Sequence, residues 1–215
     1  MPRLGPAFFD RPTLAVARDL LGALLVRRIG RGLVAGRIVE VEAYVGEDDL
    51  ACHASRGKPG KKGRAAGLYV GPGHYYVYMI YGMYWCLNVV TEREGFPAAV
   101  LVRALEPVGG VHLMRRRRRA ARRERDLANG PGRLCQALSI DGRFHGKSVE
   151  SRSLWLERGD PIPEKEVIRC PRIGVDYAGN SKDLPWRFYV RTSECVSVRD
   201  PEAERLPDQS ARSMA

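Results

Sequence analysis

The sequence lacks any long apolar segment and any export signal at its start. No apolar run approaches the about 18 residues that a membrane-spanning helix needs. The first residues, "MPRLGPAFFDRPT", do not show the charged-then-apolar pattern of a signal peptide. We therefore expect a protein that stays in the cytoplasm and has no membrane partner.

The sequence also lacks paired cysteines. Its five cysteines are scattered singly, and no C-x-x-C pair is present, so neither a zinc knuckle nor a disulfide framework is indicated. His53 lies beside Cys52 and near three acids, but no second spaced pair of ligands accompanies it. We expect reduced, mostly buried thiols and no metal site.

Lysine is scarce, whereas arginine is abundant. Of the 36 basic residues 30 are arginine, the net charge is +11 and the isoelectric point is about 9.8. Arginine suits bidentate contacts to phosphate, and a positive field favours polyanionic partners. Genomic base composition also produces arginine-rich proteins, so charge alone leaves nucleic-acid binding open. To the run at 115–125 we assign only nonspecific electrostatics.

Neither an internal repeat nor a clear linker divides the 215 residues, which predicts a single α+β domain over residues 1–215. We expect residues 1–7 and 207–215 to fray, and the Gly/Lys-rich segment 53–74 to be a mobile loop. The patterns predict helices at 10–21, 110–127 and near 129–138. They predict strands at 23–29, 34–44, 75–80, 84–88, 98–107, 153–159, 166–175 and 187–193.

The segment 75–88, "YYVYMIYGMYWCLN", predicts a hairpin that turns over Tyr81-Gly82-Met83. Tight turns normally carry small polar residues that face water. An exposed aromatic side chain at the tip lowers solubility, so its presence indicates a partner. A basic protein with such a tip could enter a duplex groove and separate base steps, while the neighbouring tyrosines offer stacking faces. The alternative, tyrosines packed in a core, fits about half of them and fits Tyr81 poorly.

The strand "RIVEVEAY" presents acidic side chains on one of its faces. With a period of two, one set should face the core and the other should carry both glutamates. Exposed glutamates would be solvated surface charges, whereas a glutamate covered by a cleft would be a candidate general base. The pattern leaves both possibilities open. The core set is Val39, Val41 and Ala43; the second set is Ile38, Glu40, Glu42 and Tyr44.

These features together indicate an enzyme that extrudes a nucleotide and acts on it with a carboxylate. Four separated segments, "EVEAY" followed by "CHASRG", "GPGHYYVYMIYGMYWCLNVV", "VLVRALEP" and "NGPGRLCQAL", resemble the 3-methyladenine (alkyladenine) DNA glycosylase family, in family order and over about residues 8–198. The resemblance implies a curved, mostly antiparallel sheet flanked by helices, with a protruding hairpin for DNA insertion. It also implies double-stranded DNA containing damaged bases as the partner, and a location at the bacterial nucleoid or in a eukaryotic nucleus. We expect a monomer.

By resemblance, each motif carries a role. Glu42 matches the general base that activates water, and Arg103 the arginine that helps hold this water. Tyr81 matches the side chain that fills the gap left by the flipped nucleotide. Tyr44, His53 and Tyr78 match the walls of the base pocket, Asn88 a residue that obstructs the amino group of guanine, and Val175 a further lining residue.

The loop after "RG" departs from the family pattern, since it is longer and carries Ala65 where an asparagine is expected. Arg64 could stand for the family's arginine, and Lys61 and Lys62 could contact DNA phosphates. No lysine falls at a matching site position, so the resemblance implies a monofunctional glycosylase without a cofactor. The alternatives are a hypoxanthine- or ethenoadenine-preferring glycosylase of the same family, a noncatalytic lesion-binding protein and an RNA-binding module.

Overall fold

A computed structural model describes residues 1–55 and 63–206, which form one α+β domain around an antiparallel sheet. Within these residues the sheet has eight strands, in the order β3-β4-β5-β2-β1-β6, with β8 on β2 and β7 on β8. The expected α+β class and antiparallel sheet are confirmed. The strands are β1 (Leu24–Ile29), β2 (Gly32–Val45), β3 (Tyr75–Ile80), β4 (Tyr84–Val90), β5 (Ala98–Gly109), β6 (Leu154–Glu157), β7 (Val167–Cys170) and β8 (Arg187–Val190).

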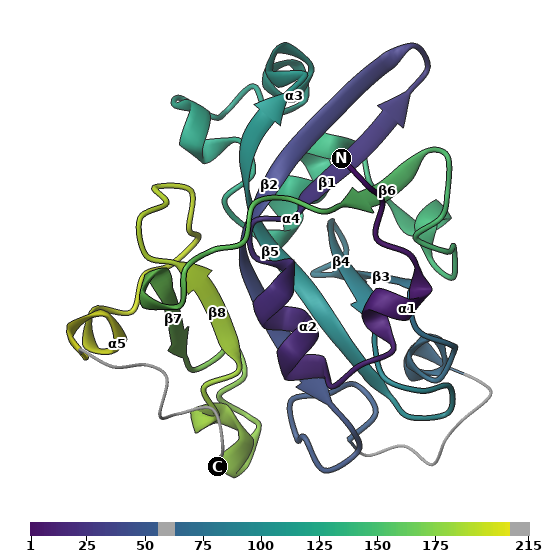
Figure 1. Ribbon diagram of the computed structural model, residues 1–215, viewed down its shortest axis with the longest axis vertical. Helices are drawn as coiled ribbons and strands as arrows, with labels where there is room; N and C mark the ends of the chain where they lie inside the picture. Colours follow the sequence, from purple (N-terminus) through teal and green to yellow (C-terminus); the bar gives the residue numbers. More distant parts are fainter. Residues whose placement is uncertain (56–62, 207–215) are drawn as a thin grey trace.

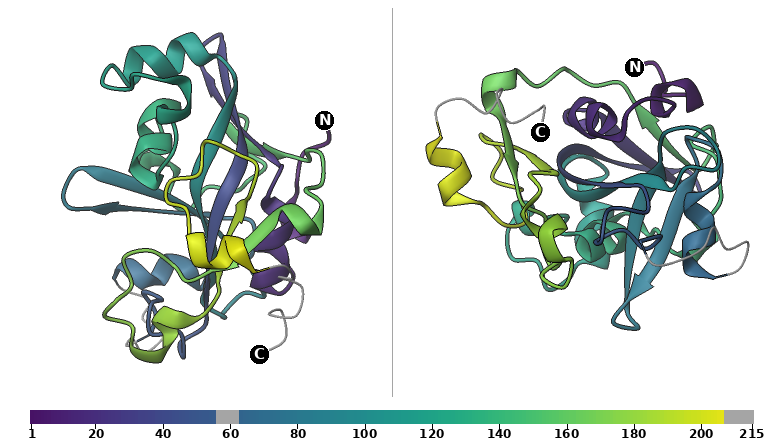
Figure 2. Two further views of the ribbon diagram at one scale, coloured as in Figure 1. Left: turned by 90° about the vertical axis from the view of Figure 1, so that its left-hand side faces the viewer. Right: turned by 90° about the horizontal axis from the view of Figure 1, so that it is seen from below.

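Helices cover both faces of the sheet (Figures 1 and 2). On one side α2 packs on β2 and β5, and on the other α4 packs on β4 and β5. The amphipathic patterns supply apolar faces for this packing, and the main core lies between these layers. The helices are α1 (Pro6–Phe9), α2 (Thr13–Leu20), α3 (Val111–Arg117), α4 (Pro131–Leu138) and α5 (Pro201–Arg205).

The N-terminal segment is held against the sheet. Arg3 forms an isolated bridge with Glu157, and the buried Leu4 donates its backbone N–H to the Leu156 carbonyl at 2.9 Å. The helix expected over 10–21 is divided, because Asp10 ends α1 and α2 begins at Thr13. Glu92 accepts the Thr13 N–H at 2.8 Å and so satisfies one of the free donors at the start of α2.

The long helix expected over 110–127 is wrong in extent, since α3 ends at Arg117. Consecutive arginines repel one another along a helix, and here their side chains bond to neighbouring segments instead. Arg117 donates to the Ala137 carbonyl at 2.9 Å, and Arg118 donates to the side chain of Gln136 at 2.7 Å. Part of the arginine run therefore anchors α3 to α4.

Strand β2 has the largest number of strand partners. Residues 32–37 pair with β1 and residues 40–42 pair with β8 along the same edge, while β5 covers the other edge. The register with β5 shifts between Ile38 and Glu40 and again between Glu40 and Val41. Such irregularities redirect side chains. Ile38 is fully buried and lies in the main core cluster together with Val39 and Val41.

Within the segment 53–74 a short 3-10 helix spans Arg64–Leu68, and its Leu68 is buried. Lys61 and Lys62, expected to contact phosphate, lie outside the described residues. No helix among the described residues is long and apolar enough to cross a membrane.

Candidate active site

A cavity of about 580 Å³ opens beside the hairpin and is lined by residues of four strands, of α4 and of three connecting segments. Cavities of this size are typical of small-molecule sites. Of the predicted site residues that the structure describes, Glu42 alone does not line this cavity. Those that line it are Tyr44, His53, Arg64, Tyr78, Tyr81, Asn88, Arg103 and Val175.

Glu42 lies directly behind the cavity surface, with a side chain that has no exposed area. Its Oε2 accepts a hydrogen bond from the Tyr44 hydroxyl at 2.8 Å and lies 3.1 Å from Arg103 Nη1. Its Oε1 accepts the Ile173 backbone N–H at 2.8 Å. All three partners line the cavity. The strand pattern left this acid either solvated or covered, and the structure shows it covered.

Among the described residues, Oε1 of Glu42 accepts one hydrogen bond whereas Oε2 has two partners. A carboxylate oxygen accepts about two hydrogen bonds. Oε1 therefore retains the capacity for one further donor.

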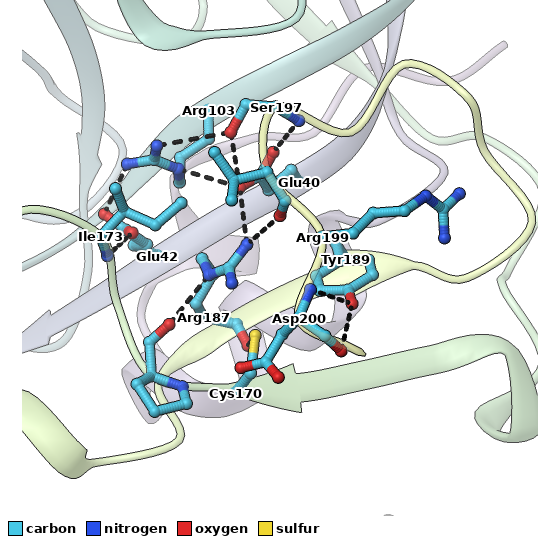
Figure 3. Close-up of polar contacts among 12 residues, drawn as sticks. Glu40, Glu42, Arg103, Cys170, Ile173, Arg187, Tyr189, Ser197, Arg199 and Asp200 are labelled. Atoms are coloured by element: carbon cyan, nitrogen blue, oxygen red, sulfur yellow. Dashed lines mark hydrogen bonds and ion pairs between the residues drawn. The ribbon is translucent and has the colours of Figure 1, made fainter. Parts of the chain in front are cut away.

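Arg103, on β5, is held by two acids. Its Nε donates to Glu40 Oε1 at 3.0 Å, while Nη1 faces Glu42 (Figure 3). Burial lowers the pKa of Arg103, but the carboxylates of Glu42 and Glu40 outweigh this effect and raise the pKa above its ordinary value. Arg103 is therefore a fixed cation at the cavity floor and not a proton donor.

Tyr44 separates Glu42 from a second buried ion pair. The Arg172 guanidinium lies 4.8 Å from the Tyr44 ring centroid and makes a bidentate pair with Asp49 at 2.6 and 2.7 Å. Burial, followed by the negative charge of Glu42, raises the pKa of Tyr44. The hydroxyl thus keeps its proton and donates it to the carboxylate in a hydrogen bond.

One wall of the cavity is aromatic. The ring of His53 meets that of Tyr78 edge-on with centroids 4.6 Å apart, and its Nδ1 lies 2.8 Å from the Tyr76 hydroxyl. Burial, and then the positive charge of Arg64, lower the pKa of His53. A neutral imidazole near neutral pH adds no charge of its own to this wall. The Arg64 guanidinium lies 5.9 Å from the Tyr78 centroid on this wall.

Asn88 and Val175 lie on other sides of the cavity. The buried Asn88 donates its amide N–H to the Tyr76 carbonyl at 3.0 Å, which fixes its orientation. Val175 is buried with Ala51 and Ala178 in a small apolar cluster against Tyr44. These contacts hold both side chains in place at the cavity surface.

The hairpin tip reaches away from the rest of the molecule, as both views of Figure 2 show for residues near 80. The Tyr81 side chain is 85% exposed, which confirms the expected exposure, and its φ is 51°. Gly82 has φ 68°, and Met83 donates its N–H to the Ile80 carbonyl at 3.1 Å. Two successive positive φ values are typical of a type I′ turn, which prefers Asn-Gly. A tyrosine here is strained.

Sequence reasoning did not assign a role to the residues that hold Arg103 from behind. Glu40 appeared as the second acid of the strand, but its partners Arg187 and Ser197 did not stand out. Tyr177, which lines the cavity and is 66% exposed, was also missed. The strand period already placed Glu40 beside Glu42, which was the one available signal.

Comparison with known proteins places this geometry in a family. The family model "Methylpurine-DNA glycosylase (MPG)" matches residues 7–194. A protein of Methanocella arvoryzae, which carries a provisional 3-methyladenine DNA glycosylase name, is 54% identical over 94% of this chain and 98% of its own. The Homo sapiens and Mus musculus proteins named DNA-3-methyladenine glycosylase are each 44% identical. The alignments cover 95% and 97% of this chain, and 71% and 66% of theirs.

The chain therefore belongs to the methylpurine-DNA glycosylase family, and the family resemblance seen in its motifs is confirmed. Members of this family are hydrolases of N-glycosyl bonds, and the expected enzyme class is confirmed with it.

Proposed function

We propose that this member of the family removes alkylated purines from duplex DNA by flipping the damaged nucleotide into the cavity and hydrolysing its N-glycosidic bond. The observation that carries the proposal is the Glu42 carboxylate behind the floor of a cavity with an aromatic wall, beside an exposed, strained Tyr81. A flipped base needs a pocket, a hydrolysis needs a base, and the vacated duplex position needs a filler.

In the proposed reaction a water molecule held by Glu42 and Arg103 attacks C1′ of the flipped nucleotide. The water gives one proton to the carboxylate of Glu42, and its oxygen forms a bond to C1′. The bond between C1′ and the purine nitrogen breaks, and its electron pair leaves with the purine. A positively charged alkylpurine becomes a neutral free base, and an abasic site remains. General-base help of this kind contributes about 10²–10⁴-fold to the rate.

The cavity surface suits a cationic base. The faces of Tyr44 and Tyr78 attract a cation, with an energy of about 2 kcal/mol or more when water is excluded. His53, whose pKa is lowered, adds no repelling charge near neutral pH. In this proposal the exposed Arg64 leaves the face of Tyr78 and contacts a DNA phosphate when the base enters.

The test uses duplex oligonucleotides that each carry one 3-methyladenine analogue, ethenoadenine or hypoxanthine. We expect free base and alkali-labile abasic sites under single-turnover conditions, and Glu42→Gln to abolish their formation while lesion binding persists. Glu157→Gln, which alters a partly buried acid of β6, is the matched control and should cleave normally. Cleavage by Glu42→Gln at the original rate would reject the assigned base, and binding without cleavage by the unaltered protein would favour the noncatalytic alternative.

A further inference from the structure

Glu40 is a buried carboxylate that the proposed reaction does not use. Its side chain has no exposed area and does not line the cavity. Its Oε1 lies 3.0 Å from Arg103 Nε, 3.2 Å from Arg187 Nη1 and 2.9 Å from Ser197 Oγ. Its Oε2 accepts the Ser197 backbone N–H at 2.6 Å. Glu40 thus cannot touch a base in the cavity and can act only through its partners (Figure 3).

The partner that connects Glu40 with the cavity is Arg103. The Nε of Arg103 donates to Glu40, and its Nη2 lies 3.4 Å from Ser197 Oγ. The Nη1 of Arg103 forms the ion pair with Glu42. An arginine next to a single carboxylate commonly makes a bidentate pair that occupies both carboxylate oxygens. Here Arg103 contacts Glu42 through Nη1, while its Nε and one N–H of its Nη2 are engaged by Glu40 and Ser197.

We propose that Glu40 is the positioning residue of this site. Glu40, fixed by Arg187 and Ser197, competes with Glu42 for the guanidinium of Arg103 and so leaves Oε1 of Glu42 without a guanidinium partner, as the proposed activation of water requires. The kinetic part of this inference rests on the proposed function, whereas its geometric part does not. In the absence of the Glu40 charge, Arg103 turns toward Glu42 and pairs with both oxygens of its carboxylate, so that Oε1 can no longer accept a hydrogen bond from water.

The kinetic test compares Glu40→Gln, Arg103→Lys and the double variant in single-turnover base release. Because a displaced catalytic group costs up to about 10²-fold, we expect Glu40→Gln to slow release by about 10–100-fold. When Glu40→Gln is added to Glu42→Gln, the affinity for lesion-containing DNA should stay within twofold of that of Glu42→Gln alone. Lysine has no planar guanidinium for Glu40 to orient. Adding Glu40→Gln to Arg103→Lys should therefore not slow base release any further. Independent, multiplying losses would overturn the proposal.

A matched control separates positioning from a general loss of stability. Glu92→Gln alters another acid that receives two hydrogen bonds, both from Thr13, away from the cavity. It should lower the melting temperature without slowing base release. If Glu40→Gln does not fold, the test uses Ser197→Ala instead. This variant lacks the hydroxyl that contacts both Glu40 and Arg103. Normal release by a folded Ser197→Ala in that case overturns the proposal.

The geometric test does not require activity. With nitrogen-15 arginine, the Nε–H resonance of Arg103, assigned by its loss in Arg103→Lys, should lie downfield because it donates to a carboxylate. The resonance should move in Glu40→Gln and stay in place in Glu92→Gln. An unmoved resonance would overturn the positioning role. Absence of base release by the unaltered protein, with the resonance moved as expected, would reject the proposed function alone.

Discussion

Replacing Tyr81 with asparagine should make the protein more stable and impair its recognition of damage. Tyr81 occupies the left-handed region, with φ 51°, at the first central position of the hairpin turn. Most residues other than glycine cost about 1–2 kcal/mol there, whereas asparagine is tolerated because its short polar side chain can hydrogen-bond to the nearby backbone. Since the tyrosine is 85% exposed, its removal sacrifices little buried area. Asparagine would also create the Asn-Gly sequence that a type I′ turn prefers.

We therefore expect Tyr81→Asn to raise the free energy of unfolding by about 1 kcal/mol. In a chain of this length, that change corresponds to about 2–4 °C in melting temperature. Thermal unfolding followed by circular dichroism measures it, with Met83→Asn as the control. Met83 is 64% exposed on the same turn but has no positive φ, so its replacement should bring no gain.

The same Tyr81→Asn variant should bind lesion-containing and normal duplexes with similar affinity, because it lacks the ring that we propose to fill the vacated position. Fluorescence anisotropy with the two duplexes measures this loss of discrimination. A melting temperature that is unchanged or lower would refute the reasoning from backbone strain. Retained discrimination would refute the role of the ring.

Two further predictions concern ionisable side chains. The pKa of His53 is lowered in the folded protein from its ordinary value of 6.5. The resulting contribution to stability is complete above pH 6.5, the pKa in the unfolded chain, and is lost as the pH falls from there through the pKa of the folded protein. Between pH 7 and pH 5 the unaltered protein should lose more unfolding free energy in urea titrations than His53→Gln does, and parallel losses would contradict this. Asp49→Ala should lower the free energy of unfolding by about 3–5 kcal/mol, because the buried Arg172 loses its bidentate partner. A loss below 1 kcal/mol in the same titration would contradict that expectation.

Much of the sheet could be predicted from local patterns. Apolar alternation and the Gly30–Gly32 turn predicted the pairing of β1 with β2, and the hairpin over Tyr81 is present with Ile80 opposite Tyr84. The extent of α3 could not be predicted in this way. Its arginines favour a helix by intrinsic propensity, but carbonyls of α4 and nearby turns compete for their side chains. Only the folded chain brings these acceptors within reach.

Site residues that lie within one sequence motif could be predicted. Site residues that are brought together only by tertiary contacts were missed. Glu42 and Tyr44 are two positions apart on one strand, so their shared face follows from the strand period. Glu40 acquires its role from Arg187 and Ser197, which lie 147 and 157 positions away in the chain. No local pattern joins residues at such a separation. The shift of β2 against β5 near Glu40 is likewise a tertiary effect.

The crowding of partners around β2 has a consequence for how the protein opens. Since β2 is paired on both edges and by three strands, its backbone amides near Glu42 can exchange with solvent only when most of the sheet separates. The Tyr81 turn depends on one neighbouring strand and can fray by itself. The exposed turn can therefore open while the buried Glu42 carboxylate on β2 keeps its place until the sheet separates.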